Sequence, residues 1–167
     1  MKVAVHGIFL AFFLIVQATW LEAIAVFGVK PNLFIIYIVT LSCFCSKKEG
    51  AITGFFFGIM LDFVIGKALG LNAVLLLALG FLTAQFCEKV IRKNSVLIVM
   101  LITLITSVCY ELFYYVVSFV GDLEFKSVFF RTLLPECIYN SLMTLPVYFV
   151  IKKLSNRLWV DKGEIIG

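Results

Sequence analysis

Four carboxylic acids and one arginine interrupt the most apolar stretches of this chain. They are Glu22, Asp62, Glu111, Glu136 and Arg131. A carboxyl group in such surroundings can carry a proton, orient a ligand or anchor a neighbouring helix, and an arginine can hold an anionic group. Because a charged group is expensive to bury, each of these side chains is expected to face a protein interior or a wet cavity that supplies partners.

The composition identifies the medium in which these groups sit. Of the 167 residues, 63% are hydrophobic and 14% are charged, whereas a soluble domain has roughly 45–50% apolar and about 25% charged residues. So few polar residues cannot cover a water-facing surface, and the chain is therefore predicted to be an integral membrane protein. This excludes a secreted disulfide scaffold, an ordinary cytosolic enzyme and a nucleic-acid-binding domain.

The apolar runs predict an all-α polytopic membrane bundle of six transmembrane helices, since a spanning helix needs about 20 apolar residues. Two shorter runs flank Ser46-Lys47-Lys48-Glu49 and could be thin crossings or a re-entrant hairpin. Crossing is favoured, because a hairpin would bury both lysines at about +2.5 to +3.5 kcal/mol each. The predicted spans form one domain, 1–151, and a cytoplasmic basic tail follows at 152–167. The spans are 3–29, 31–46, 50–65, 69–87, 96–120 and 128–151.

The positive charges predict that both termini face the cytoplasm. With six spans, ten lysines and arginines fall on the inner side and three on the outer side, as the positive-inside rule requires. The inner set is Lys2, Lys47, Lys48, Lys89, Arg92, Lys93, Lys152, Lys153, Arg157 and Lys162, and the outer set is Lys30, Lys67 and Lys126. In this orientation the four acids lie roughly 4 to 10 Å outside the midplane at 1.5 Å per residue. Arg131 lies further out, and the five side chains share the outer half of the membrane.

Residue patterns for catalysis and metal binding are missing from the sequence. The five cysteines include no C-x-x-C pair, and the sole histidine is His6, so no zinc or haem site, and no other cofactor, is expected. Gly66-Lys67 lacks the flanking residues of a phosphate-binding loop. Ala23-Ile24-Ala25 resembles a signal-peptide cleavage site, but the weakly charged amino terminus favours an uncleaved first helix. We therefore expect a protein that is not an enzyme.

Glycines recur every fourth residue through the third predicted span and the loop after it. They are Gly50, Gly54, Gly58, Gly66 and Gly70, with Asp62 in the remaining slot. On a helix this spacing forms a groove into which another backbone can settle. Close packing inside the protein's own bundle is the favoured interpretation, and binding of a partner's helix is the alternative. For Asp62, a clasp bonded to amides of the following loop is favoured over a transport ligand.

Polar residues also recur every fourth position on the last two predicted spans. Thr103, Ser107 and Glu111 form one stripe, and Thr132, Glu136, Asn140 and Thr144 form the other. The two stripes are expected to face each other or a shared cavity. Two interpretations stay open, namely interhelical hydrogen bonds of about 0.6 kcal/mol each and a functional groove.

In the block around the glycine repeat, the chain resembles the MreD family of bacterial rod shape-determining membrane proteins. The resemblance rests on Lys30-Pro31-Asn32, on the spacing of Gly54, Gly58, Asp62 and Gly66, and on Leu69-Gly70-Leu71-Asn72 with Gly80. It covers the length and the block from 31 to 80, and beyond residue 95 it rests on hydropathy. The resemblance also implies a fold similar to the six-helix substrate-binding subunits of energy-coupling-factor transporters.

The resemblance implies a non-enzymatic scaffold in the bacterial cytoplasmic membrane that maintains rod shape. Members of the family work with the bitopic protein MreC, alongside the actin-like MreB filament, the glycosyltransferase RodA and its transpeptidase partner, so that wall synthesis follows the cell cylinder. Two sets of residues are then expected to hold a partner's helix or its juxtamembrane segment. The first is the glycine stripe with Asp62, and the second is an outer-half polar cluster of Glu22, Asp62, Glu111, Arg131, Glu136 and Asn140.

Two other functions remain as alternatives. A vitamin-type solute-binding subunit would enclose an outward-facing cavity, with Glu111, Glu136 and Arg131 as orienting groups. An independent ion or proton carrier would also use the acids, but the sequence shows no inverted-repeat spacing, which places this function last.

Overall fold

The computed structural model describes residues 2–20, 25, 28–65, 70–90, 95–118 and 129–158, and within them the chain is helical, with no strand. These residues form six α-helices and two short π-helical segments. They are α1 (Lys2–Ile15), η1 (Val16–Trp20), α2 (Leu33–Ser42), α3 (Lys47–Ile65), α4 (Leu71–Val90), α5 (Val96–Ser118), η2 (Phe129–Leu133) and α7 (Leu134–Leu158). The predicted all-α class is therefore confirmed for the described residues.

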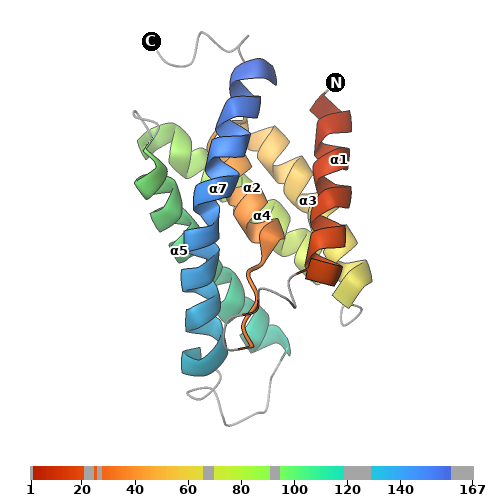
Figure 1. Cartoon of the computed structure of the whole chain (residues 1–167), viewed down its shortest axis with the longest axis vertical. Coiled ribbons are helices and arrows are strands. Elements are labelled where there is room, and N and C mark those ends of the chain that lie inside the picture. The colour runs from red at the N-terminus through yellow and green to blue at the C-terminus, as the bar shows by residue number, and fades with distance from the viewer. Residues whose placement is uncertain are drawn as a thin grey trace.

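The helices form a bundle in which the first helix begins and the last helix ends at the same end, uppermost in Figure 1. The turn between α2 and α3 lies at that end too. Three helical stretches are long and apolar enough to cross a membrane, namely Leu71–Lys89, Val96–Val116 and Phe129–Ser155. By length and composition, then, at least these three have the character of membrane spans.

The second helix is shorter and more enclosed than predicted. All ten residues of α2 are buried, and the helix contacts α3, α4, α5 and α7. At 1.5 Å per residue it is about 15 Å long, half the thickness of the hydrocarbon core. The helical part of the predicted span 31–46 is therefore Leu33–Ser42, and protein surrounds it, because a helix that is apolar on every side can be covered by protein as readily as by lipid.

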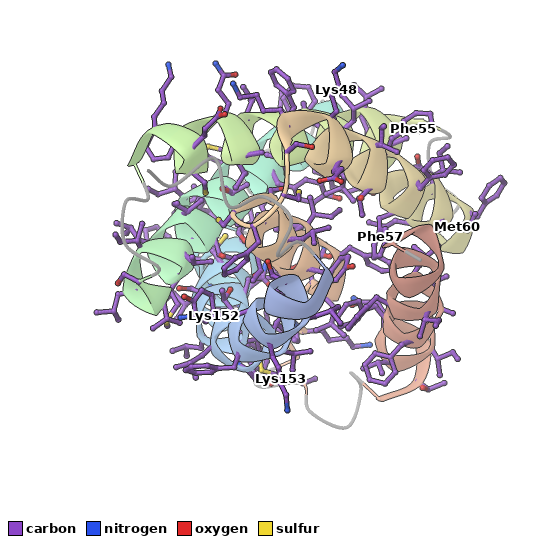
Figure 2. All side chains as sticks on the ribbon, turned by 90° about the horizontal axis from the view of Figure 1, so that it is seen from above. Lys48, Phe55, Phe57, Met60, Lys152 and Lys153 are labelled. Carbon is purple, nitrogen blue, oxygen red and sulfur yellow. The ribbon has the colours of Figure 1, made fainter. Side chains whose placement is uncertain are left out.

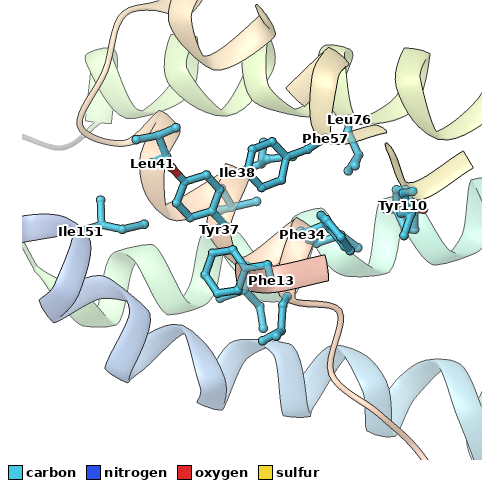
Figure 3. Packing of buried hydrophobic residues seen from close by; sticks show 14 of the residues in the cluster. Phe13, Phe34, Tyr37, Ile38, Leu41, Phe57, Leu76, Tyr110 and Ile151 are labelled. Carbon is cyan, nitrogen blue, oxygen red and sulfur yellow. The ribbon is translucent and has the colours of Figure 1, made fainter. Parts of the chain in front are cut away.

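Aromatic rings join α2 to its neighbours at the centre of the bundle. The Tyr37 ring stacks on Phe57 of α3 with a centroid distance of 4.9 Å, and it meets the Phe9 and Phe13 rings of α1 at 5.3 and 5.2 Å. Figure 3 shows Tyr37 between Phe13 and Phe57. Because such pairs add about 0.5–1.5 kcal/mol each beyond burial, Tyr37 fixes the positions of three helices.

Two helix ends differ from the ends of the predicted spans. The first span was expected to reach residue 29, but Gly28 has a φ of +81° and the chain is not helical from there to Asn32. Glycine adopts this conformation readily, so it redirects the chain toward α2. The last span was expected to end at 151, whereas α7 continues to Leu158 and carries Lys152 and Lys153 in its final turns. The rest of the predicted tail lies outside the described residues.

Candidate functional site

Asp62 near the end of α3 binds the beginning of α4. Its carboxylate is buried and accepts hydrogen bonds from the backbone N–H groups of Gly70 (2.9 Å), Asn72 (3.0 Å) and Ala73 (3.2 Å). The Asn72 side-chain amide donates a fourth, at 2.8 Å. The first N–H groups of a helix have no partner within the helix, and a negative charge there is favoured by the helix dipole. Asp62 therefore has the geometry of the clasp expected from the sequence.

A tyrosine extends this clasp to a third helix. The Tyr110 hydroxyl on α5 donates to the side-chain oxygen of Asn72, and both residues are buried. Asn72 thus uses its amide toward Asp62 and its carbonyl toward Tyr110, which satisfies both ends of the side chain. Asn72 and Tyr110 were not predicted as site residues, since neither belongs to the four-residue repeats that singled out Asp62.

The glycine stripe of α3 is filled by α4 of the same chain. A Cβ atom added to Gly54 would lie 2.1 Å from the Leu76 carbonyl oxygen, and one added to Gly58 would lie 2.4 Å from the Ala73 Cα. At the upper end, a Cβ on Gly80 of α4 would lie 2.3 Å from the carbonyl oxygen of Gly50. The two backbones are in direct contact, as small residues permit in membranes. This groove is therefore occupied and is not open to a partner's helix.

The amino terminus of α2 is capped within the bundle interior. Asn32 is the N-cap residue, and its side-chain oxygen accepts hydrogen bonds from the N–H groups of Phe34 (3.2 Å) and Ile35 (3.3 Å). Asparagine is among the best N-cap residues because its short side chain reaches these amides. The cap accounts for the Pro-Asn dipeptide ahead of the second predicted span.

Side chains from distant helices satisfy the other two amides at this point. The Asn32 N–H donates to the Asn140 side-chain oxygen of α7 at 2.6 Å, and the Leu33 N–H donates to the Gln17 oxygen of η1 at 3.2 Å. Asn140 also donates its amide to the Ser107 hydroxyl of α5 at 3.2 Å. Asn140 therefore connects α2, α5 and α7, and Gln17 is a further residue that the sequence did not single out.

The polar stripes of α5 and α7 face each other, as the sequence predicted. The Ser107–Asn140 bond joins them, and one turn away on each helix Glu111 and Glu136 lie close enough to interact with each other. These polar groups are engaged with one another, which supports the interhelical interpretation over an open groove.

Among the described residues, Arg131 and Thr132 do not join this network. Arg131 is exposed on η2, and among the described residues no ion pair links it to an acid. Thr132 is also exposed. Gly70 has a φ of +94° and lies in the turn before α4, so it belongs to the clasp and not to the groove. Glu22 and Gly66 lie outside the described residues.

A small pocket adjoins Glu111 between α5 and the beginning of α7. It is lined by Val108, Leu112, Leu133 and Cys137, among others, and has a cavity volume of about 10 Å³, about the space of one water molecule. Sites for small molecules measure about 300–1,000 Å³. This pocket is too small for a vitamin-sized solute.

Replacing Asn140 with alanine is expected to lower the free energy of unfolding by about 1–3 kcal/mol, because the Asn32 N–H loses its acceptor in a partly buried position. Ser141→Ala is the matched control, since Ser141 makes one hydrogen bond, to the Met100 carbonyl at 3.0 Å, and such a bond contributes about 0.6 kcal/mol on average in a membrane. Thermal unfolding in one detergent measures both. If Ser141→Ala lowered the free energy of unfolding as much as Asn140→Ala or more, the bridging role of Asn140 would be contradicted.

Comparison with known proteins gives one match to the chain. A family model described as rod shape-determining protein MreD matches residues 2–158. No curated protein and no solved structure gives a significant match to the chain.

Proposed function

The chain belongs to the MreD family of rod shape-determining membrane proteins, and we propose that it is a non-enzymatic membrane scaffold of the bacterial cell-elongation complex. In this role it binds MreC and helps to couple the MreB cytoskeleton to peptidoglycan synthesis by RodA and its transpeptidase partner. The observation that carries the proposal is this family match along nearly the whole chain.

The state of the buried polar groups supports a scaffold. Asp62, Asn140 and the Glu111–Glu136 pair all bind other parts of the same chain, so they hold helices together. Neither the network nor the small adjoining pocket offers an open solute site, which leaves the transporter-subunit alternative without a supporting observation. The polar residues define a rigid frame whose outer faces are free for association.

Those outer faces are apolar. Large side chains are exposed on α3, α4, α5 and α7, and they include Phe56 (56%), Leu82 (58%), Leu101 (56%) and Leu142 (59%). Viewed from the upper end of the bundle, Phe55 lies at the periphery and Phe57 lies inside (Figure 2). In a bilayer such faces meet lipid or the helix of a partner. We infer that MreC, a bitopic protein, docks its single membrane helix on one of them.

For the arrangement in the membrane, we propose six passes with both ends in the cytoplasm, in the bacterial inner membrane. Support comes from the shared end at which α1 begins and α7 ends (Figure 1). Lys47 and Lys48 begin α3, and Lys152 and Lys153 lie near the end of α7, which gathers basic residues at this end as the positive-inside rule requires. In this arrangement the short α2 and the non-helical segment before it make the second pass together.

Site-specific photocrosslinking tests the scaffold and locates its contact face. A photoreactive amino acid is placed at Phe56, Leu82, Leu101 or Leu142, and membranes from cells that contain MreC are irradiated. Adducts with MreC are expected from neighbouring positions on one face, and the buried Phe57 position serves as the matched control without adducts. The proposal would be overturned if none of the exposed positions gave adducts and the tagged protein also failed to retain MreC after solubilisation.

A further inference from the structure

Two cysteine thiols meet where α2 and α4 end. The Sγ atoms of Cys43 and Cys87 are 2.7 Å apart, Cys87 is buried and Cys43 is partly exposed. The Cys43 sulfur also lies 3.3 Å from the Val39 carbonyl oxygen, to which its thiol donates. The Cys87 thiol can then donate to the Cys43 sulfur. Neither cysteine belongs to the polar network described above.

The surrounding structure holds the two thiols together. Glu88, next to Cys87, forms an ion pair with Lys47 at 2.7 Å, which joins the end of α4 to the beginning of α3. Below it, Gly50 of α3 and Gly80 of α4 are in backbone contact. Since Cys43 lies in the turn that leads into α3, these contacts place the end of α4 beside that turn without a bond between the two sulfur atoms.

The pair does not have the character of a metal site. A tetrahedral zinc ion with bonds of about 2.3 Å keeps two thiolate sulfurs about 3.8 Å apart, farther than these two are. Among the described residues, no group of three or more histidine, cysteine, aspartate or glutamate side chains could hold a metal ion. The separation of 2.7 Å lies between the value for a zinc site and the sulfur–sulfur bond length of about 2.05 Å in a disulfide.

We propose that Cys43 and Cys87 form a redox-active dithiol that closes to a disulfide between α2 and α4. The oxidant is a small-molecule disulfide. The Cys43 thiolate attacks it, forms a mixed disulfide and releases one thiol, which takes up the Cys43 proton. Cys87 then attacks the Cys43 sulfur, the Cys43–Cys87 bond forms, and a second thiol leaves with the Cys87 proton. Two protein thiols are oxidised and one disulfide is reduced.

The order of these steps follows from the difference in exposure between the two cysteines. Cys43 is partly exposed and receives the oxidant, whereas Cys87, with 4% exposure, is reached by Cys43 but not by a bulky reagent. In the proposed orientation the pair lies at the cytoplasmic end, where glutathione and thioredoxin keep thiols reduced. The resting form is then the dithiol, and oxidative conditions close the bond and tie the central helix to α4.

Counting thiols in the full-length protein tests the proposal. Membranes are treated with glutathione disulfide, dissolved in SDS and labelled with a maleimide polymer that adds a fixed mass to each free cysteine. Wild type, which has five cysteines, is expected to carry five labels before oxidation and three afterwards, and dithiothreitol should restore five. Retention of five labels after oxidation would overturn the proposal.

Single substitutions identify the partners. Cys43→Ser and Cys87→Ser should each carry four labels before and after oxidation, once glutathione adducts are removed by a monothiol wash too weak to open the internal bond. Cys109→Ser, on the exposed face of α5, and Cys45→Ser are matched controls and should each fall from four labels to two. A fall from four labels to two in Cys87→Ser would refute Cys43 and Cys87 as the partners. Peptide mapping of oxidised wild type gives the same answer without any variant, through a Cys43–Cys87 cross-linked peptide.

Discussion

Replacing Asp62 with leucine is expected to lower the free energy of unfolding by about 3–5 kcal/mol, because several buried hydrogen-bond donors lose one shared acceptor. The substitution leaves the Asn72 and Ala73 N–H groups and the Asn72 amide without their acceptor. Each buried donor without a partner costs about 1–3 kcal/mol. Thermal unfolding of the purified protein in detergent, followed by the loss of monodisperse material, measures the effect.

Two controls separate the clasp from general sensitivity of this region. Asp62→Asn keeps one carbonyl oxygen as an acceptor and should lie between wild type and Asp62→Leu. Phe63→Leu changes the next residue, whose side chain is 68% exposed, and should unfold like wild type. If the stability of Asp62→Leu were within about 1 kcal/mol of wild type, less than the cost of one unpaired buried donor, Asp62 would not hold α4.

Replacing Gly54 with alanine is expected to lower the free energy of unfolding by at least about 3 kcal/mol, as strong overpacking does. Alanine is intrinsically better than glycine in a helix by about 0.8–1.0 kcal/mol, so propensity alone predicts a gain. The added Cβ atom, however, would lie 2.1 Å from the Leu76 carbonyl oxygen, and backbone cannot move aside as a flexible side chain can. The two helices must separate, and Gly54→Leu should be worse still.

Gly7→Ala on α1 is the matched control, because a Cβ added there meets nothing within 4 Å. This variant should unfold at or above the temperature of wild type, which gives the two alanine substitutions opposite signs. The same thermal measurement in one detergent decides the matter. If Gly54→Ala were as stable as Gly7→Ala, the close contact between α3 and α4 would be refuted.

The backbone contact between α3 and α4 also changes how a loss of cell shape should be interpreted. Since α4 fills the groove, a bulky residue at Gly54 or Gly58 would disturb rod shape through misfolding, whether or not MreC binds nearby. Such variants therefore test the fold. The exposed positions on α3, α4, α5 and α7 test association, because substitutions there leave the internal contacts intact.

Local patterns predicted the parts of the structure that depend on local spacing. The four-residue repeat of Gly50, Gly54 and Gly58 predicted a close helix contact, and the place of Asp62 after it predicted a bond to the following loop. The stripes containing Glu111 and Glu136 faced each other as expected. In each case a repeat of four residues puts side chains on one helix face, and the chemistry of those side chains leaves few arrangements.

Other features lie beyond what spacing can predict. The Asn32–Asn140 bond joins residues 108 positions apart, and no local signal points from one to the other. Arg131 was grouped with the acids because of its predicted depth in the membrane. Depth does not say toward which side of the helix a side chain points, and the Arg131 side chain is exposed. The apolar run from Leu33 to Ser42 could not reveal whether lipid or protein would surround it, since both favour the same residues.

The enclosure of α2 has a consequence for how the protein is made. When the ribosome has completed α2, the helix is too short to cross the bilayer by itself, and α4, α5 and α7, which surround it, have not yet been synthesised. The N–H group of Asn32, the N-cap residue of α2, has its acceptor on Asn140, 108 residues later in the chain. Insertion therefore cannot be completed helix by helix in the order of translation. The centre of the bundle is finished only when α7 has left the ribosome, and a chain truncated before α7 should be recognised by the cell as unfinished.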